Sequence, residues 1–95
     1  MAILHIEHEI NDLDTWLGAF GRFEEARRGA GVIAQRVTHP IDDDNYIVIQ
    51  LDFGTAEEAE NFKGFLENRI WTNPDASPAL AGTPKARVLL EVDAE

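Results

Sequence analysis

The chain has 95 residues, of which 44% are hydrophobic, and its 18 acidic against 8 basic side chains give a formal net charge of −10. This length predicts one domain, residues 1–95, whose small core would benefit from burial between subunits. The acidic surplus argues against nucleic acid as a partner, and the absence of cysteine excludes disulfides, thiolate metal sites and a cysteine nucleophile.

Residues 2–10 alternate between apolar and polar side chains, which predicts a strand with His5 and Glu7 on one face and His8 on the other. Asp12 stands where a helix N-cap is expected. A helix over residues 13–28 follows, with an apolar stripe, and glycines end it. That stripe consists of Leu13, Trp16, Phe20 and Phe23.

Residues 32–39 predict a second strand that alternates poorly and stops at Pro40, before a polar turn over 42–45. Residues 46–53 form the clearest strand pattern. Thr55 and Glu58 then make a capping box for a helix over 56–70. The segment 72–84 contains three of the four prolines, which predicts an irregular connector, and residues 85–93 predict the last strand.

The front and middle of the chain repeat each other at an offset of 43 positions, so that Ile6 and Asp12 recur as Ile49 and Thr55. Two strand–helix–strand units with right-handed crossovers close into a ferredoxin-like α+β fold with the order βαββαβ. We expect a four-stranded antiparallel sheet in the order 4-1-3-2 with both helices on one face.

The sheet face away from the helices combines apolar and polar side chains: Ile3, His5, Glu7, Tyr46, Val48, Gln50, Arg87, Leu89 and Glu91. Such a face is too apolar to be well solvated and too polar for an ordinary core. A second copy of the same sheet would cover the apolar groups, and a symmetric homodimer is the commonest assembly. We therefore expect a homodimer through this open face, with the polar groups lining an interior cavity.

The segment 10–16 with Phe20, together with residues 45–53 and the proline-rich connector, resembles the dimeric α+β barrel superfamily. This superfamily includes the antibiotic-biosynthesis-monooxygenase type and many small bacterial proteins of unassigned activity. The resemblance implies a barrel-like dimer with a central cavity and no particular reaction. Haem-degrading relatives use a histidine in the second half of the chain, and here no histidine follows His39, so we expect no haem and no other cofactor.

His5 and Glu7 are two residues apart on a strand, so both side chains are expected to point into the cavity. A histidine–carboxylate pair can relay a proton, which makes these two the predicted catalytic pair. The same pair could instead supply metal ligands, with His39 as a third, or form a polar contact across the dimer interface. We predict no metal, with His39 exposed at a strand end and His8 in the core with one hydrogen bond.

Substrate positioning is predicted for four further residues: Tyr46, Gln50, Arg87 and Trp71. Tyr46 and Gln50 share the face of His5, and Arg87 is suited to an anionic group. Because residues 32–39 alternate poorly, the sequence does not decide whether Arg36 faces the cavity. Trp71 either walls the cavity mouth beneath the connector or closes the core.

Three functions remain open from the sequence. The first is a cofactor-independent monooxygenase or a cyclase or isomerase, acting on a small apolar or aromatic molecule. The second is a module that binds a small ligand without turning it over, and the third is a structural dimer without a ligand. Because no signal peptide and no apolar run of roughly 20 residues is visible, we expect a cytoplasmic protein without a membrane partner.

Overall fold

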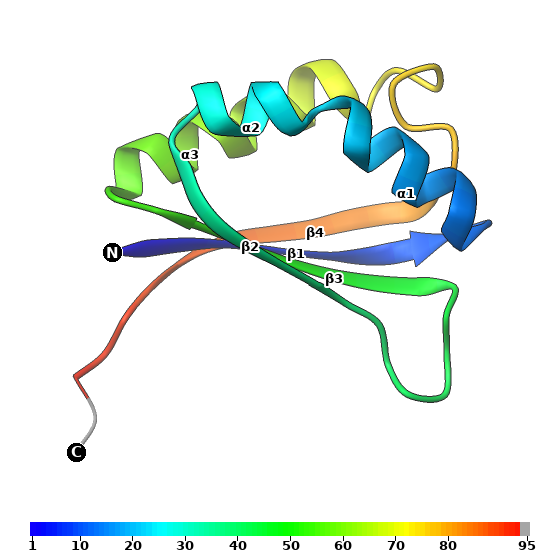
Figure 1. Ribbon diagram of the computed structural model, residues 1–95, viewed down its shortest axis with the longest axis horizontal. Helices are drawn as coiled ribbons and strands as arrows, with labels where there is room; N and C mark the ends of the chain where they lie inside the picture. Colours follow the sequence, from blue (N-terminus) through cyan, green and yellow to red (C-terminus); the bar gives the residue numbers. More distant parts are fainter. Residues whose placement is uncertain (94–95) are drawn as a thin grey trace.

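A computed structural model describes residues 1–93 of the chain. One antiparallel sheet has the strand order β2-β3-β1-β4, and the helices lie together on one of its faces while the other face is uncovered (Figure 1). The elements in chain order are β1 Ala2–Ile10, α1 Leu13–Arg22, α2 Glu24–Gly29, β2 Val32–Thr38, β3 Tyr46–Phe53, α3 Ala56–Phe65, the π-helix η1 Leu66–Ile70, and β4 Leu80–Leu90. The predicted ferredoxin-like fold and its strand order are confirmed.

The core lies between the helices and the two central strands, β1 and β3. Alternate residues of these strands are buried, because successive side chains of a strand point to opposite faces. The helix-facing side chains of both strands have almost no exposed surface: Leu4, Ile6, Ile10, Ile47, Ile49, Leu51 and Phe53. Trp16 from α1 and Phe62 from α3 pack onto this surface.

Both predicted N-caps are present at equivalent places in the repeat. The Asp12 carboxylate accepts from the backbone N–H of Thr15 at 2.9 Å, and the Thr55 hydroxyl oxygen accepts from that of Glu58 at 3.2 Å. Each bond satisfies one of the amide donors that the first helical turn leaves without a partner.

The predicted helix over residues 13–28 is wrong in one respect, since Phe23 interrupts it and divides it into α1 and α2. Phe23 has φ −103° and ψ 16°, outside regular helical values. The carbonyl of Phe20 accepts a hydrogen bond from the Arg27 guanidinium at 2.6 Å. A side chain that inserts into the backbone ladder is a recognised cause of a helix break.

The predicted helix over 56–70 also changes character, because its last five residues form the π-helix η1. The N–H of Trp71 bonds to the carbonyl of Leu66 at 2.8 Å, five residues back. Short π-helical turns are rare and frequently lie at functional sites.

The last strand is displaced from its predicted range of 85–93, since β4 begins at Leu80 and ends at Leu90. The connector is correspondingly shorter than 72–84. Pro84 lies inside β4, which is possible because β4 is an edge strand whose register with β1 shifts beside this point. Val92, which the predicted range includes, lies outside β4 and is exposed.

The poor alternation of β2 comes from a register shift against β3 between Val32 and Ala34. Arg36 consequently pairs with Gln50 and lies on the open face, whereas Gln35 pairs with Leu51 on the helix side. In residues 1–93, no helix is both long enough and apolar enough to cross a membrane.

Candidate functional site

The open face of the sheet brings His5, Glu7, Tyr46 and Gln50 into one hydrogen-bonded network. His5 and Gln50 are cross-strand partners in β1 and β3. The imidazole Nε2 lies 2.9 Å from a Glu7 carboxylate oxygen, and the Tyr46 hydroxyl donates to the other oxygen at 2.6 Å. The sequence therefore placed these four side chains together correctly, while their chemical role stays a prediction.

When the His5 ring is neutral, the network determines which of its two nitrogens carries the proton. The Gln50 amide nitrogen can only donate, and it lies 3.2 Å from His5 Nδ1, so Nδ1 accepts and Nε2–H donates to Glu7. Hydrogen bonds from Tyr46 and His5 lower the pKa of Glu7. The same carboxylate raises the pKa of Tyr46. Both nitrogens of His5 are therefore occupied within the subunit.

Arg87 stands opposite His5 on β4, and Lys85 stands opposite Glu7. A shallow groove of about 510 Å³ runs over this part of the open face, lined by His5, Glu7, Gln50, Lys85, Arg87 and Leu89. Four of the predicted site residues thus border one open groove, and Tyr46 joins them through Glu7.

Two residues considered at the sequence level lie elsewhere. Trp71 packs against the core on the helix side of the sheet, so the structure does not bring it to His5. His39 is exposed in the β2–β3 connection, where Nδ1 lies 2.6 Å from the carbonyl of Pro40. No group of three histidine or acidic residues within residues 1–93 is arranged to hold a metal ion.

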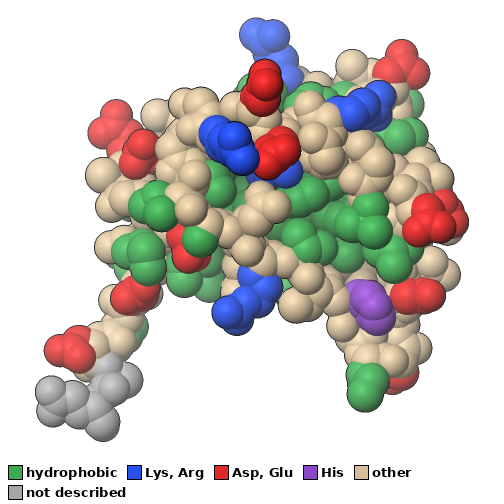
Figure 2. All heavy atoms as spheres, viewed as in Figure 1, with side chains coloured by type: hydrophobic (Ala, Val, Ile, Leu, Met, Phe, Trp, Pro, Cys, Tyr) green, Lys and Arg blue, Asp and Glu red, His purple; other side chains and the backbone are tan. Residues whose placement is uncertain are grey.

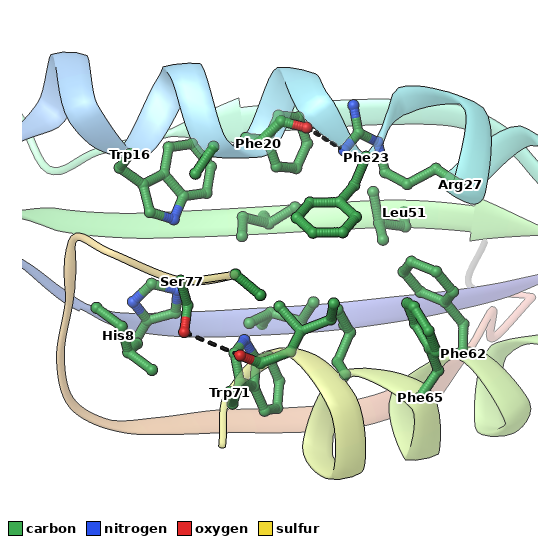
Figure 3. Close-up of a pocket in the computed structure, with 17 residues that line it drawn as sticks. His8, Trp16, Phe20, Phe23, Arg27, Leu51, Phe62, Phe65, Trp71 and Ser77 are labelled. Carbon is green, nitrogen blue, oxygen red and sulfur yellow. Dashed lines mark hydrogen bonds between the residues drawn. The ribbon is translucent and has the colours of Figure 1, made fainter. Parts of the chain in front are cut away.

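A second candidate site lies between the helices and the sheet. It is a cavity of about 80 Å³ with apolar walls, lined by aliphatic side chains and by six aromatic ones: Trp16, Phe20, Phe23, Phe62, Phe65 and Trp71. Figure 2 shows hydrophobic side chains gathered below α1, between the helical layer and the sheet. In Figure 3, His8, Ser77 and Trp71 lie at one end of the cavity, and Phe62 and Phe65 lie at the other. We call this cavity the aromatic pocket.

His8 is the buried polar group of this pocket, with 4% of its surface exposed. Its Nδ1 lies 2.8 Å from the carbonyl oxygen of Glu9, which only accepts, so Nδ1 carries the proton. Burial lowers the pKa of His8, and the bond to Glu9 offsets this in part. Nε2 is then an unprotonated acceptor without a hydrogen-bond partner in residues 1–93. Among the described residues, no unpartnered side-chain nitrogen or oxygen is fully enclosed, so Nε2 keeps some accessible surface, and His8 lines the pocket.

Arg27 and Ser77 hold the two walls of the aromatic pocket. The Arg27 guanidinium is buried, stacks on the Phe20 ring at 3.7 Å and donates to Gln35 at 3.0 Å, which ties α2 to β2. The Ser77 hydroxyl lies 2.9 Å from the carbonyl oxygen of Ile70, which ties the connector to the end of η1 (Figure 3). His8 and Arg27 are the two ionisable side chains among the described residues that line the pocket.

Sequence reasoning placed His8 on the helix side and gave it one hydrogen bond, and both expectations are confirmed. It did not identify a pocket around His8. The alternation of β1 was the available signal, since it separated His8 from His5. The lining of this pocket includes Phe23, where the helix breaks, and residues of the π-helix, and neither feature has a local sequence signature.

Comparison with known proteins gives the fold a context. No family model matches the chain, and no curated protein sequence matches it. A candidate antibiotic biosynthesis monooxygenase from Nitrosomonas europaea superposes with a TM-score of 0.71 at 16% identity, covering 97% of this chain and 99% of that one. A dimeric ferredoxin-like protein from an uncultured marine organism superposes with a TM-score of 0.68 at 10% identity, covering 100% of this chain and 97% of that one.

An uncharacterised NIPSNAP domain protein from Burkholderia xenovorans is also similar, with a TM-score of 0.61 at 13% identity over 98% of this chain and 96% of that one. Identities this low establish the fold alone. This chain therefore has the ferredoxin-like α+β fold of antibiotic-biosynthesis-monooxygenase-like and dimeric ferredoxin-like proteins, over nearly its whole length.

Proposed function

We propose that the chain forms a homodimer through its open sheet face, and that each subunit binds a small, flat, mostly apolar molecule in the aromatic pocket. The observation that supports this most directly is the state of His8. A neutral imidazole with a fixed tautomer presents an unpartnered Nε2 to an aromatic cavity. A ligand hydroxyl or an acidic C–H would find there a hydrogen-bond acceptor and a base.

The walls of the pocket select the ligand class. Aromatic rings at the walls favour a planar ring through stacked and edge-on contacts. No carboxylate lines the pocket among the described residues, so a neutral or anionic ring suits it better than a cation. A phenol-like molecule, with its hydroxyl donating to His8 Nε2, meets both conditions.

Proton removal from such a ligand leaves an electron-rich ring or enolate. This species is the starting point for oxygenation by molecular oxygen and for isomerisation or cyclisation, none of which requires a bound cofactor in this proposal. The relatives described as antibiotic biosynthesis monooxygenases support the first of these reactions. An oxygen electrode separates the options, since only an oxygenase consumes oxygen at a rate that depends on His8.

The network on the open face supports a second candidate site, in which His5 is the acid–base group, Glu7 orients it, and Tyr46, Gln50 and Arg87 position a ligand inside the dimer. The groove of about 510 Å³ beside His5 favours it. Against it stands the engagement of both His5 nitrogens by Glu7 and Gln50. A ligand would have to displace one of these partners.

Calorimetric titration with phenol and toluene decides between the two histidines. We expect phenol to bind the wild type and His5→Leu with similar affinity, and His8→Leu at least about tenfold more weakly, as for loss of a buried hydrogen bond. Toluene has no hydroxyl to donate to His8, so neither substitution should weaken its binding. Absence of phenol binding to the wild type would reject the pocket as a ligand site. A loss confined to His5→Leu would move the site to the open face.

A further inference from the structure

The aromatic pocket is small for a metabolite. Its volume of about 80 Å³ lies below the roughly 300 Å³ at which ligand pockets usually begin. A single ring anchored at His8 would nearly fill it. Any larger ligand must therefore extend beyond the pocket.

A neighbouring groove offers that space. It has a volume of about 330 Å³ and lies between α2 and α3, lined by Ala26, Ala30, Glu58, Asn61, Phe62 and Phe65. Phe62 and Phe65 line the pocket as well. These two rings lie at the end of the pocket away from His8 (Figure 3), so groove and pocket share one aromatic wall.

Of the two rings in this wall, Phe65 is the more exposed, and its centroid lies 5.7 Å from that of Phe62. Phe62 is buried, with its ring centroid 6.0 Å from that of Phe53. Phe65 is 36% exposed and follows Gly64, where an added Cβ would meet no atom within 4 Å. The opposite side of the groove presents only the methyl groups of Ala26, from α2, and of Ala30, the residue that caps it. Rotation of the Phe65 ring would join the two spaces.

The groove differs from the pocket in its polarity. Glu58 contributes a half-buried carboxylate, and Asn61 contributes an amide. One Glu58 oxygen accepts from the Thr55 hydroxyl at 3.2 Å, and no cation pairs with this carboxylate in residues 1–93. A donor-rich or cationic group is the complement of this end, whereas the His8 end takes a ring hydroxyl.

We infer that the pocket and the groove form one two-part site for an elongated amphiphilic ligand. Its hydroxylated ring lies in the aromatic pocket, and an arm ending in an amine or another hydrogen-bond donor passes Phe65 towards Asn61 and Glu58. This inference rests on the proposed function, because the ring anchors the ligand at His8.

The probes that test it are phenol, tyramine, which adds an aminoethyl arm to the same ring, and 4-hydroxyphenylacetate, whose arm is anionic. Calorimetry on the full chain should show tyramine binding about tenfold more tightly than phenol, as for one charge-assisted contact, and 4-hydroxyphenylacetate binding more weakly than phenol. Because the whole protein is acidic, a general attraction for cations needs its own control.

Two variants, Glu58→Gln and Glu57→Gln, provide this control when they are compared with each other. They change the net charge equally, and glutamine still completes the capping box with Thr55, so α3 keeps its start. We expect Glu58→Gln to abolish the advantage of tyramine while leaving phenol unchanged, and Glu57→Gln to keep it. Equal affinities for phenol and tyramine in the wild type, or an advantage that survives in Glu58→Gln, would overturn the two-part site while leaving the ring site intact. Failure of the wild type to bind either probe would remove both.

Discussion

His5 and His8 are three residues apart on one strand and have opposite surroundings. The pleat of β1 turns His5 to the open face, where Glu7 and Gln50 occupy its two nitrogens. It turns His8 to the helix side, where one nitrogen bonds to the backbone and Trp16 packs edge-on with ring centroids 6.4 Å apart. An imidazole is thus part of a hydrogen-bonded network at His5, whereas at His8 it lines a cavity with one nitrogen unpartnered among the described residues.

Burial of His8 predicts a pH dependence of stability. The pKa of His8 is lowered in the folded state, so the unfolded chain binds a proton more readily, and stability falls as the pH drops below the ordinary histidine value of about 6.5. Urea denaturation at pH 7.5 and 5.0 should show a smaller acid loss in His8→Leu than in the wild type. His39→Leu replaces an exposed histidine, and its free energy of unfolding should fall between pH 7.5 and 5.0 by as much as that of the wild type.

The lowered pKa of Glu7 acts in a separate, more acidic window. Its stabilising contribution is present above the unfolded value of about 4.5 and is lost as the pH falls below it. The comparison between pH 7.5 and 5.0 therefore reports mainly on His8. An unchanged pH dependence in His8→Leu would contradict its assignment as a buried neutral imidazole.

The helical segment made of α3 and η1 changes from an α-helix to a π-helix beside the pocket. After ten α-helical residues in α3, the chain widens into η1, and Leu66, Ile70 and Trp71 all line the pocket. A π-turn holds one residue more than an α-turn between bonded groups. The widening sets the angle at which Trp71 leaves the helix, and the Ser77 bond to Ile70 holds it.

Deleting Asn68 from η1 tests this element. The shorter segment should return to α-helical bonding, with the turn between Leu66 and Trp71 tightened by one residue, so that the side chains of this turn no longer meet the pocket as they do in η1. We expect phenol affinity to fall about tenfold or more in calorimetry, while the far-ultraviolet circular dichroism stays close to that of the wild type. Deleting Asp43, in the exposed β2–β3 connection, is the control and should leave phenol binding unchanged. Full binding after loss of Asn68 would show that the π-helix does not shape the pocket.

At the scale of the whole molecule, the helices cover one sheet face and leave the other uncovered (Figure 1). The uncovered face mixes half-buried Ile3, Val48 and Leu89 with the hydrogen-bonded network around Glu7. Solved proteins of this fold include some described as dimeric. A second copy on this face would remove the apolar side chains from water and enclose the network.

Val48→Asp tests the predicted dimer. Val48 stands directly opposite Glu7, so a second carboxylate there would place two like charges at the centre of the interface. Size-exclusion chromatography with light scattering should show a dimer for the wild type and a dissociation constant about 100-fold higher for the variant. Leu17→Asp, at an exposed position of α1, should leave the dimer intact. A monomeric wild type would reject both the interface and the enclosed cavity.

The sequence by itself determined the features that depend on local periodicity. The alternation of β1 and β3 placed His5, Glu7, Tyr46 and Gln50 on one face and His8 on the other. Asp12 and Thr55 marked the helix starts, because a capping side chain acts on amides only two or three residues away. With a repeated strand–helix–strand pattern, these signals led to the four-stranded sheet and its strand order.

Tertiary structure alone decided where the aromatic pocket lies. The helix break at Phe23 depends on Arg27 reaching the Phe20 carbonyl, and the start of β4 at Leu80 depends on its pairing with Ile10. Trp71 lies at the end of η1 and packs against the core on the helix side. These features arise from a side chain that bonds to a helix carbonyl, from contacts between segments distant in the chain or from competition between backbone bonding patterns, none of which residue spacing encodes.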